Sequence, residues 1–326
     1  MFRNCIFLVT AACLAVASAL QTAHADDWPS KPVRIVIPFG AGGTSDRFGR
    51  LVATELSRVF KQSFYVENKP GAAGATGSLE VARAKPDGYT LVIAGMGPNV
   101  TGPALNPNIG YDPINDFTHI VMIAGDTTSF VINPALGVKT LPEFVALARG
   151  ATVSLTAGSS GVGTMTHLSL EMLRRKASVM NLIHVPYRGG GPLAIDLLGH
   201  HLSAAFIATA SGIEHVRSGA VLPLAVTASE RIATLKGVPT FAELGYPDVE
   251  STTWGWISGP PHMPDDIVIK LNRAVQDFVG STEMRARFAA ESMVTKQMDS
   301  AALTAFLRGE LRRWTALVEE AGLREK

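Results

Sequence analysis

Four stretches of this chain share one design: a short apolar segment, a glycine-rich turn, and then a segment that favours a helix. In the first stretch, Arg34–Pro38 leads through Gly40–Gly43 to a helix expected over 46–60, whose apolar residues recur at the spacing of one buried face. The other three stretches begin with the apolar segments 64–66, 153–155 and 184–185, and their turns lie at 71–77, 158–163 and 189–191. Strands that alternate with helices in this way predict an α/β fold with largely parallel sheets flanked by helices.

Further apolar runs complete this pattern. The runs at 89–94, 120–124 and 223–227 are typical of strands that are covered on both faces. Towards the end of the chain the pattern predicts helices alone, over 264–279, 282–290 and 300–321.

The first 25 residues have the pattern of a signal peptide. Arg3 precedes the apolar run Ile6–Leu20, and Ala23–Ala25 supplies the small residues of a cleavage site. We therefore expect residues 1–25 to be removed after Ala25, which leaves an exported, periplasmic protein. An uncleaved membrane anchor and a lipoprotein modified at Cys13 are the alternatives.

Charge and cysteine content exclude several classes of protein. The chain has 29 Lys and Arg residues against 28 Asp and Glu residues. It therefore lacks the basic excess that indicates nucleic-acid binding, and no such binding is expected. Both cysteines, Cys5 and Cys13, leave with the predicted leader. The mature chain would then hold no disulfide, no thiolate nucleophile and no cysteine-ligated zinc, and no cofactor is expected.

The glycine-rich turns do not complete any common catalytic motif. A dinucleotide-binding turn would need glycine where Ser45 stands, and a P-loop would need lysine where Thr164 stands. A nucleophile elbow would need glycine in place of Val162, and the adjacent His200 and His201 do not form a metal-binding HExxH motif. We therefore expect no enzyme and no metal site.

The same turns are suited to binding an anion. The N-terminus of a helix leaves up to about four backbone N–H groups unpaired and carries roughly half a positive charge. A carboxylate placed there is stabilised without a basic side chain, and neighbouring Ser and Thr residues add hydroxyl donors. The alternative is that these turns are ordinary connections between strands and helices.

Short motifs in a fixed order carry a resemblance to a known family. In the first half of the chain they are 28–34 (WPSKPVR), 38–43 (PFGAGG) with Asp46, 66–71 (VENKPG), 85–90 (KPDGYT), and 111–113 with 116–117. In the second half they are 161–164 (GVGT) with 167–168, 184–189 (HVPYRG), 196–199 (DLLG), 224–227 (LAVT), 238–240 and 270–272. The chain resembles the substrate-binding receptors of tripartite tricarboxylate transporters, often called Bug receptors, over essentially its whole predicted mature length.

This resemblance implies a type II clamshell, in which two lobes of the periplasmic-binding-protein kind enclose a ligand. The chain would cross from the first lobe near 125–128 and return near 249–253. The first lobe would comprise residues 26–126 and 250–326, and the second lobe residues 127–249. The resemblance also implies a small carboxylate ligand, possible membrane transporter subunits as partners, and a monomer.

Backbone amides and hydroxyls are expected to hold the carboxylate. The candidate residues are Gly42, Gly43, Thr44, Ser45 and Asp46 in the first lobe, with Gly97 and Asn99, and Gly161, Gly163, Thr164, Met165 and Arg188 in the second. Asp46 would repel an anion, so a role as helix cap suits it better. Arg188 is either a partner for a distal carboxylate or a solvated residue at the rim. His167, His184, Trp254 and Trp256 are interpreted as structural residues.

Two departures from the family bear on the ligand. Many relatives carry acidic residues where this chain has Ser203 and Ile207, so an ammonium-bearing ligand is not expected and a plain mono- or dicarboxylate is favoured. Two other functions stay open. One is an exported hydrolase or transferase that pairs Ser159 or Ser160 with His167 or His184, and the other is a sensor that passes its ligand-bound form to a signalling partner.

Overall fold

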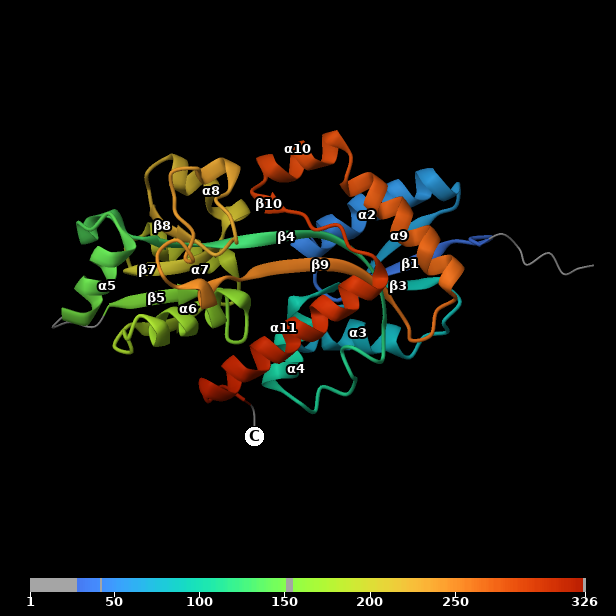
Figure 1. Ribbon diagram of the computed structural model, residues 1–326, viewed down its shortest axis with the longest axis horizontal. Coiled ribbons are helices and arrows are strands. Elements are labelled where there is room, and N and C mark those ends of the chain that lie inside the picture. Colours follow the sequence, from blue (N-terminus) through green and yellow to red (C-terminus); the bar gives the residue numbers. More distant parts are fainter. Residues whose placement is uncertain (1–27, 42, 151–154, 325–326) are drawn as a thin grey trace, which may run out of the picture.

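Two long strands cross from one half of the molecule to the other (Figure 1). Strand β4 covers Thr118–Ile132, strand β9 covers Thr252–Gly259, and the two run antiparallel. The computed structural model describes residues 28–41, 43–150 and 155–324. The strand order is β2-β1-β3-β9-β4-β7-β5-β6, with β8 and β10 also paired to β4.

The first half of the molecule is built on three parallel strands. Strand β1 (Val33–Ile37) lies between β2 (Phe64–Asn68) and β3 (Thr90–Gly95). Its side chains alternate between two cores, as a strand buried on both faces requires. Ile35 and Ile37 pack in one core with α2 (Thr44–Phe60) and α9 (Asp265–Val279), and Val36 packs in another with α3 (Ala75–Ala82).

The second half repeats this arrangement with other elements. Strand β5 (Thr156–Ser159) runs parallel to β6 (Ile183–Pro186) and β7 (Ala204–Ala208). Strand β4 pairs antiparallel with β7 and with β8 (Leu222–Val226). The helices of this half are α5 (Leu141–Gly150), α6 (Met165–Lys176), α7 (Gly190–Leu198) and α8 (Thr209–Arg217).

The sheet is mixed, although the sequence predicts largely parallel sheets. Its outer strands are parallel in both halves, as expected, whereas the central pairs that involve β4 and β9 are antiparallel. The reason is that β4 leaves the first half and β9 returns to it. Strand β4 changes partner between Thr127, which lies opposite Thr252 of β9, and Thr128, which lies opposite Ala208 of β7.

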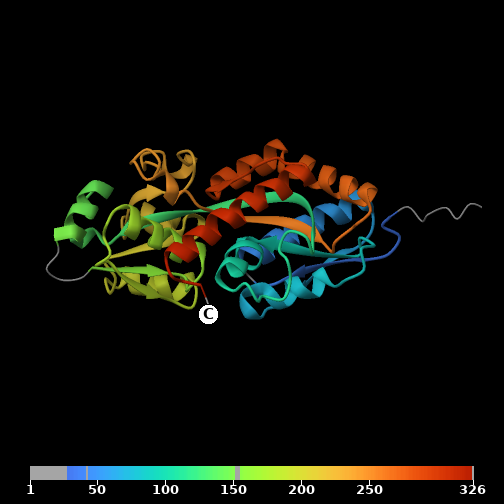
Figure 2. The ribbon, with the colours of Figure 1, turned by 60° about the horizontal axis from the view of Figure 1, so that its bottom comes forward.

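The C-terminal segment is helical apart from one short strand. Helices α9, α10 (Thr282–Ala290) and α11 (Ser300–Glu320) agree closely with the predicted ranges. Strand β10 (Met293–Val294), which the sequence does not predict, pairs with β4. Helix α11 runs obliquely along the two long strands, and its apolar residues belong to the core that extends into both halves (Figures 1 and 2).

Three predictions fall on residues that the structure does not describe. The signal peptide lies within residues 1–27, Gly42 is a single undescribed position, and most of the predicted strand 153–155 lies within 151–154. Within the described ranges, no helix combines the length and apolar character needed to cross a membrane.

Candidate functional site

A cleft of about 600 Å³ lies between the two halves, against the crossing strands. This volume is in the range of pockets that hold small molecules. The first half contributes Phe39, Gly43–Ser45, Phe48, Ala73, Gly95–Gly97, Thr101, Gly102 and Leu105. The second half contributes Ser160, Val162–Thr166, Gly189 and Ala208, and the crossing strands contribute Asp126, Thr128 and Thr253–Gly255.

The N-termini of two helices border this cleft from opposite halves. Helix α2 begins at Thr44, and its N-cap is Gly43, which has no side chain to accept from the first N–H groups. Helix α6 begins at Met165, and the side chain of its N-cap Thr164 accepts from the N–H of His167, the third residue of the helix. Both helices therefore offer backbone donors and positive dipole ends to the same cavity. The arrangement is suited to an anion that is held from two sides.

The cleft contains little charge. Of the described residues that line it, Asp126 is the only one with an ionisable side chain. Asp126 is 5% exposed, and the Ala210 N–H lies 3.5 Å from its Oδ1. Burial raises the pKa of Asp126 to about 7, although the Ala210 N–H and the positive charge of Arg47 act to lower it. Both the protonated and the ionised form of this carboxyl are therefore populated at neutral pH.

Seven of the predicted site residues line the cleft together: Gly43, Thr44, Ser45, Gly97, Gly163, Thr164 and Met165. Gly43 has a φ of −79°, so its backbone does not require glycine. Gly163 has a φ of +77°, and a Cβ there would come within 2.4 Å of Leu105 Cδ1 from the other half. Glycine is therefore required at Gly163, where the two halves touch across the cleft.

Four predicted residues lie outside the cleft lining. The carboxylate of Asp46 is buried in the first turn of α2, where it accepts hydrogen bonds from Asn68 and from Arg50. Asn99 is buried, and its amide atoms have no hydrogen-bond partner among the described residues. Gly161 supports the second turn, since its carbonyl accepts from Thr164 Oγ1 at 2.7 Å. Arg188 is exposed to solvent.

Several lining residues were not predicted as site residues from the sequence. Five of them are large apolar residues: Phe39, Phe48, Met96, Leu105 and Val162. Trp254, expected from the sequence to be structural, packs edge-on against Phe306 and also lines the cleft. For Asp126 a signal was available, because a single acidic residue stands within a long apolar strand.

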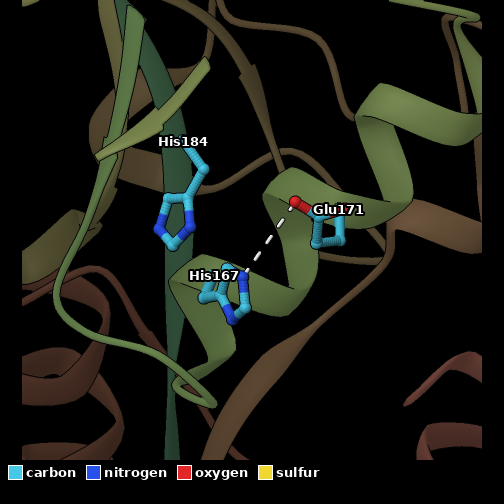
Figure 3. Close-up of side chains that lie close together, drawn as sticks. All are labelled: His167, Glu171 and His184. Carbon is cyan, nitrogen blue, oxygen red and sulfur yellow. Dashed lines mark ion pairs between the residues drawn. The ribbon is translucent and has the colours of Figure 1, made fainter. Parts of the chain in front are cut away.

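Three titratable residues gather behind the second turn (Figure 3). The rings of His167 and His184 stack at 4.2 Å with an angle of 17°, and His167 Nε2 lies 4.0 Å from Glu171 Oε1. His167 Nδ1 accepts from the Gly163 N–H at 3.0 Å, so its proton is on Nε2. A metal ion at Nε2 would need the other tautomer, and stacked rings do not direct their nitrogens at one point. This geometry favours a structural role in which His167 holds the 161–163 turn.

Burial keeps both imidazoles neutral. It lowers the pKa of His167 to about 4, and it lowers the pKa of His184 to about 4, where the neighbouring His167 acts in the same direction. His184 Nε2 lies 2.7 Å from Ser159 Oγ, the pairing that a hydrolase would need. Ser159, however, is fully buried and is not among the lining residues of the cleft. This pair is therefore not presented to a substrate there.

Comparisons with known proteins agree on one family. The model of the tripartite tricarboxylate transporter family receptor matches residues 48–323. Protein BugT of Bordetella pertussis is 30% identical over 98% of this chain and 97% of its own length. A protein encoded between ttuE and ttuC′ in Agrobacterium vitis is 34% identical over 91% of this chain and 86% of its own.

Solved structures extend this likeness to the fold. A structure of an R. palustris protein with adipate has a TM-score of 0.80 and 31% identity, covering 91% of this chain and 99% of its own. MatC of Rhodopseudomonas palustris, solved with bound malate, has a TM-score of 0.76 and 28% identity, covering 89% of this chain and all of its own. The predicted two-lobed α/β fold of the periplasmic-binding-protein kind is confirmed by these structures.

Proposed function

The chain belongs to the tripartite tricarboxylate transporter receptor family, and we propose that it is an exported receptor that captures a small carboxylate in the cleft. The observation that carries this proposal is the pair of helix N-termini, of α2 and α6, that border one cavity from opposite halves. Backbone N–H groups and the hydroxyls of Thr44, Ser45 and Thr164 would bind the carboxylate oxygens. No Lys, Arg or His among the described lining residues competes for this role.

Two related structures support the choice of ligand class. The R. palustris proteins are described with adipate and with malate, which are both carboxylates. We extend only the chemical class to this chain, since an overall identity of 28–31% leaves room for different lining residues.

The same proposal includes the setting in which the receptor works. It would be periplasmic after cleavage at Ala25, act as a monomer, and deliver its ligand to membrane transporter subunits. The first lobe would comprise residues 26–126 and 250–326, and the second residues 127–249. The change of partner on β4 between Thr127 and Thr128 lies next to this proposed boundary.

A thermal-shift screen tests the ligand class directly. The purified mature protein would be heated with a panel of mono-, di- and tricarboxylates, and hits would be measured by calorimetry. A ligand at about 100 times its Kd should stabilise the protein by roughly 2.7 kcal/mol. A panel in which no carboxylate raises the Tm would refute the proposal. A parallel esterase assay should give no turnover above the buffer rate, and turnover that persists in the purified protein would favour the hydrolase alternative.

A further inference from the structure

A second pocket of about 210 Å³ lies in the second half, against α7, β7 and α8. Its large side chains are apolar except for His215: they are Leu193, Leu197, Leu198, Phe206, Ile207 and Val221. A dry apolar cavity of about 150 Å³ is already large enough for benzene.

This side pocket adjoins the cleft. The two spaces share the lining residues Ser160, Thr166 and Ala208, whose side chains are all small. Ser160 Oγ and Thr166 Oγ1 lie 2.8 Å apart and bond each other, so neither hydroxyl needs water at the boundary. Thr166 belongs to the first turn of α6. The boundary of the pocket is thus next to one of the two helix N-termini proposed to hold the carboxylate.

The charge in the cleft limits what else the ligand can carry. Asp126 is the only ionisable side chain among the described lining residues, and its ionised form would repel a second carboxylate. No basic side chain among them is placed to compensate for such a charge. The remaining lining is largely apolar.

We propose that the ligand is a monocarboxylic acid with an apolar chain or ring, which enters the side pocket while its carboxylate lies at the N-termini of α2 and α6. This inference rests on the proposed function and narrows its ligand class. The two conditions come from different observations: the side pocket favours an apolar tail, and Asp126 disfavours a second acid group.

Calorimetry with four acids tests the inference. Butyrate, hexanoate and 3-phenylpropionate differ in the size of the apolar part, and adipate has the length of hexanoate with a second carboxylate. Each buried methylene should tighten binding about four-fold. Hexanoate should therefore bind at least ten-fold more tightly than butyrate, and also more tightly than adipate.

Variants that fill the side pocket supply the structural test. Ala194→Phe fills it from α7, and Ser211→Phe fills it from α8. Either variant can be used for the test if the other does not fold. Both should weaken hexanoate at least ten-fold and change butyrate by less than two-fold. Ile195→Phe is the matched control, because Ile195 is on the same helix, is 71% exposed and does not line the pocket. Its Kd for hexanoate should equal that of the unmodified protein.

The outcomes separate this inference from the proposed function. If adipate binds as tightly as hexanoate and the filled variants leave the hexanoate-to-butyrate ratio unchanged, the apolar-tail inference is wrong and the carboxylate receptor stands. If none of these acids binds and no carboxylate of the wider panel binds either, the proposed function fails as well.

Discussion

Asp126 is a buried acid that also lines the cleft. Its pKa is raised to about 7, far above the value near 3.9 of an unfolded chain. Between about pH 4 and pH 7 the unfolded state has lost this proton and the folded state retains it. Stability from this group therefore falls as the pH rises through this window and is level above it.

The Asp126→Asn variant should remove this dependence. Its stability relative to the unmodified protein should increase from pH 4 to pH 7, by at most about 1.4 kcal/mol per pH unit, and then stay constant. Chemical unfolding at several pH values measures the difference. Glu214→Gln, at a residue whose side chain is 74% exposed, is the control. A difference that is independent of pH would show that Asp126 has an ordinary pKa.

The pH dependence of stability must be compared between the variant and the unmodified protein, because three buried histidines change stability with pH in the opposite direction. Burial lowers the pKa of His119, His167 and His184 to about 4 in each case. Their unfolded pKa is about 6.5, so their contribution is lost as the pH falls from about 6.5 to 4. In the unmodified protein the two effects oppose each other.

Gly43 and Gly40 offer a paired test of the first binding turn. Gly43 lines the cleft, and a Cβ there would meet only Gly40 O, at 3.9 Å, so Gly43→Val should fold normally. Its side chain would stand beside the N-terminus of α2 and weaken carboxylate binding by at least ten-fold. Gly40→Val, in the same turn but outside the lining, should bind as before. Equal affinities for both variants would remove this turn from the site.

At the scale of elements, buried hydroxyls join the strands where the two halves meet. Thr227 Oγ1 accepts from the Thr128 N–H at 3.0 Å and lies 2.6 Å from the Ser251 carbonyl, to which it donates. Thr128 is the first β4 residue to pair with β7, and Ser251 immediately precedes β9. One side chain thus links the outgoing and returning strands to the segment that follows β8.

Thr227→Val should therefore destabilise the protein by about 1–3 kcal/mol, because it leaves the buried Thr128 N–H without this acceptor. The free energy of unfolding, measured with urea, checks the value. Thr227→Ser keeps the hydroxyl and should cost less. A valine variant as stable as the serine variant would show that the hydroxyl contributes nothing at this crossing.

At the scale of the whole molecule, the cleft and the two crossing strands predict hinge closure about the ligand. Gly163 and Leu105 touch across the cleft in this structure, a contact that a closed state would keep and an open state would lose. Small-angle scattering with saturating ligand should give a smaller radius of gyration than without it. Identical radii in the two states would contradict a clamshell mechanism.

We also expect the affinity for the carboxylate to depend only weakly on salt. The ligand charge would be met by backbone dipoles at contact distance inside a cleft, well within the Debye length of about 8 Å at physiological salt. Its Kd should therefore increase only a few-fold between low and moderate ionic strength. A steep dependence would point to a surface site built on ion pairs.

The repeating units and the turns that border the site are encoded in local stretches of the sequence. Helical periodicity predicts α2, α9, α10 and α11 closely, because their buried faces are encoded in local spacing. The glycine- and hydroxyl-rich turns at Gly43–Ser45 and Gly163–Met165 were predicted as binding elements, and the structure brings them to one cavity.

The surroundings of these turns depend on contacts between segments that lie far apart in the chain. The antiparallel centre of the sheet depends on where β4 and β9 meet, which is a pairing of residues more than a hundred positions apart. The apolar wall of the cleft, the side pocket below α7 and the environment of Asp126 are likewise formed by distant segments. Local sequence patterns cannot specify such neighbours, because the burial of a residue and the pKa of a buried group depend on the segments packed around it.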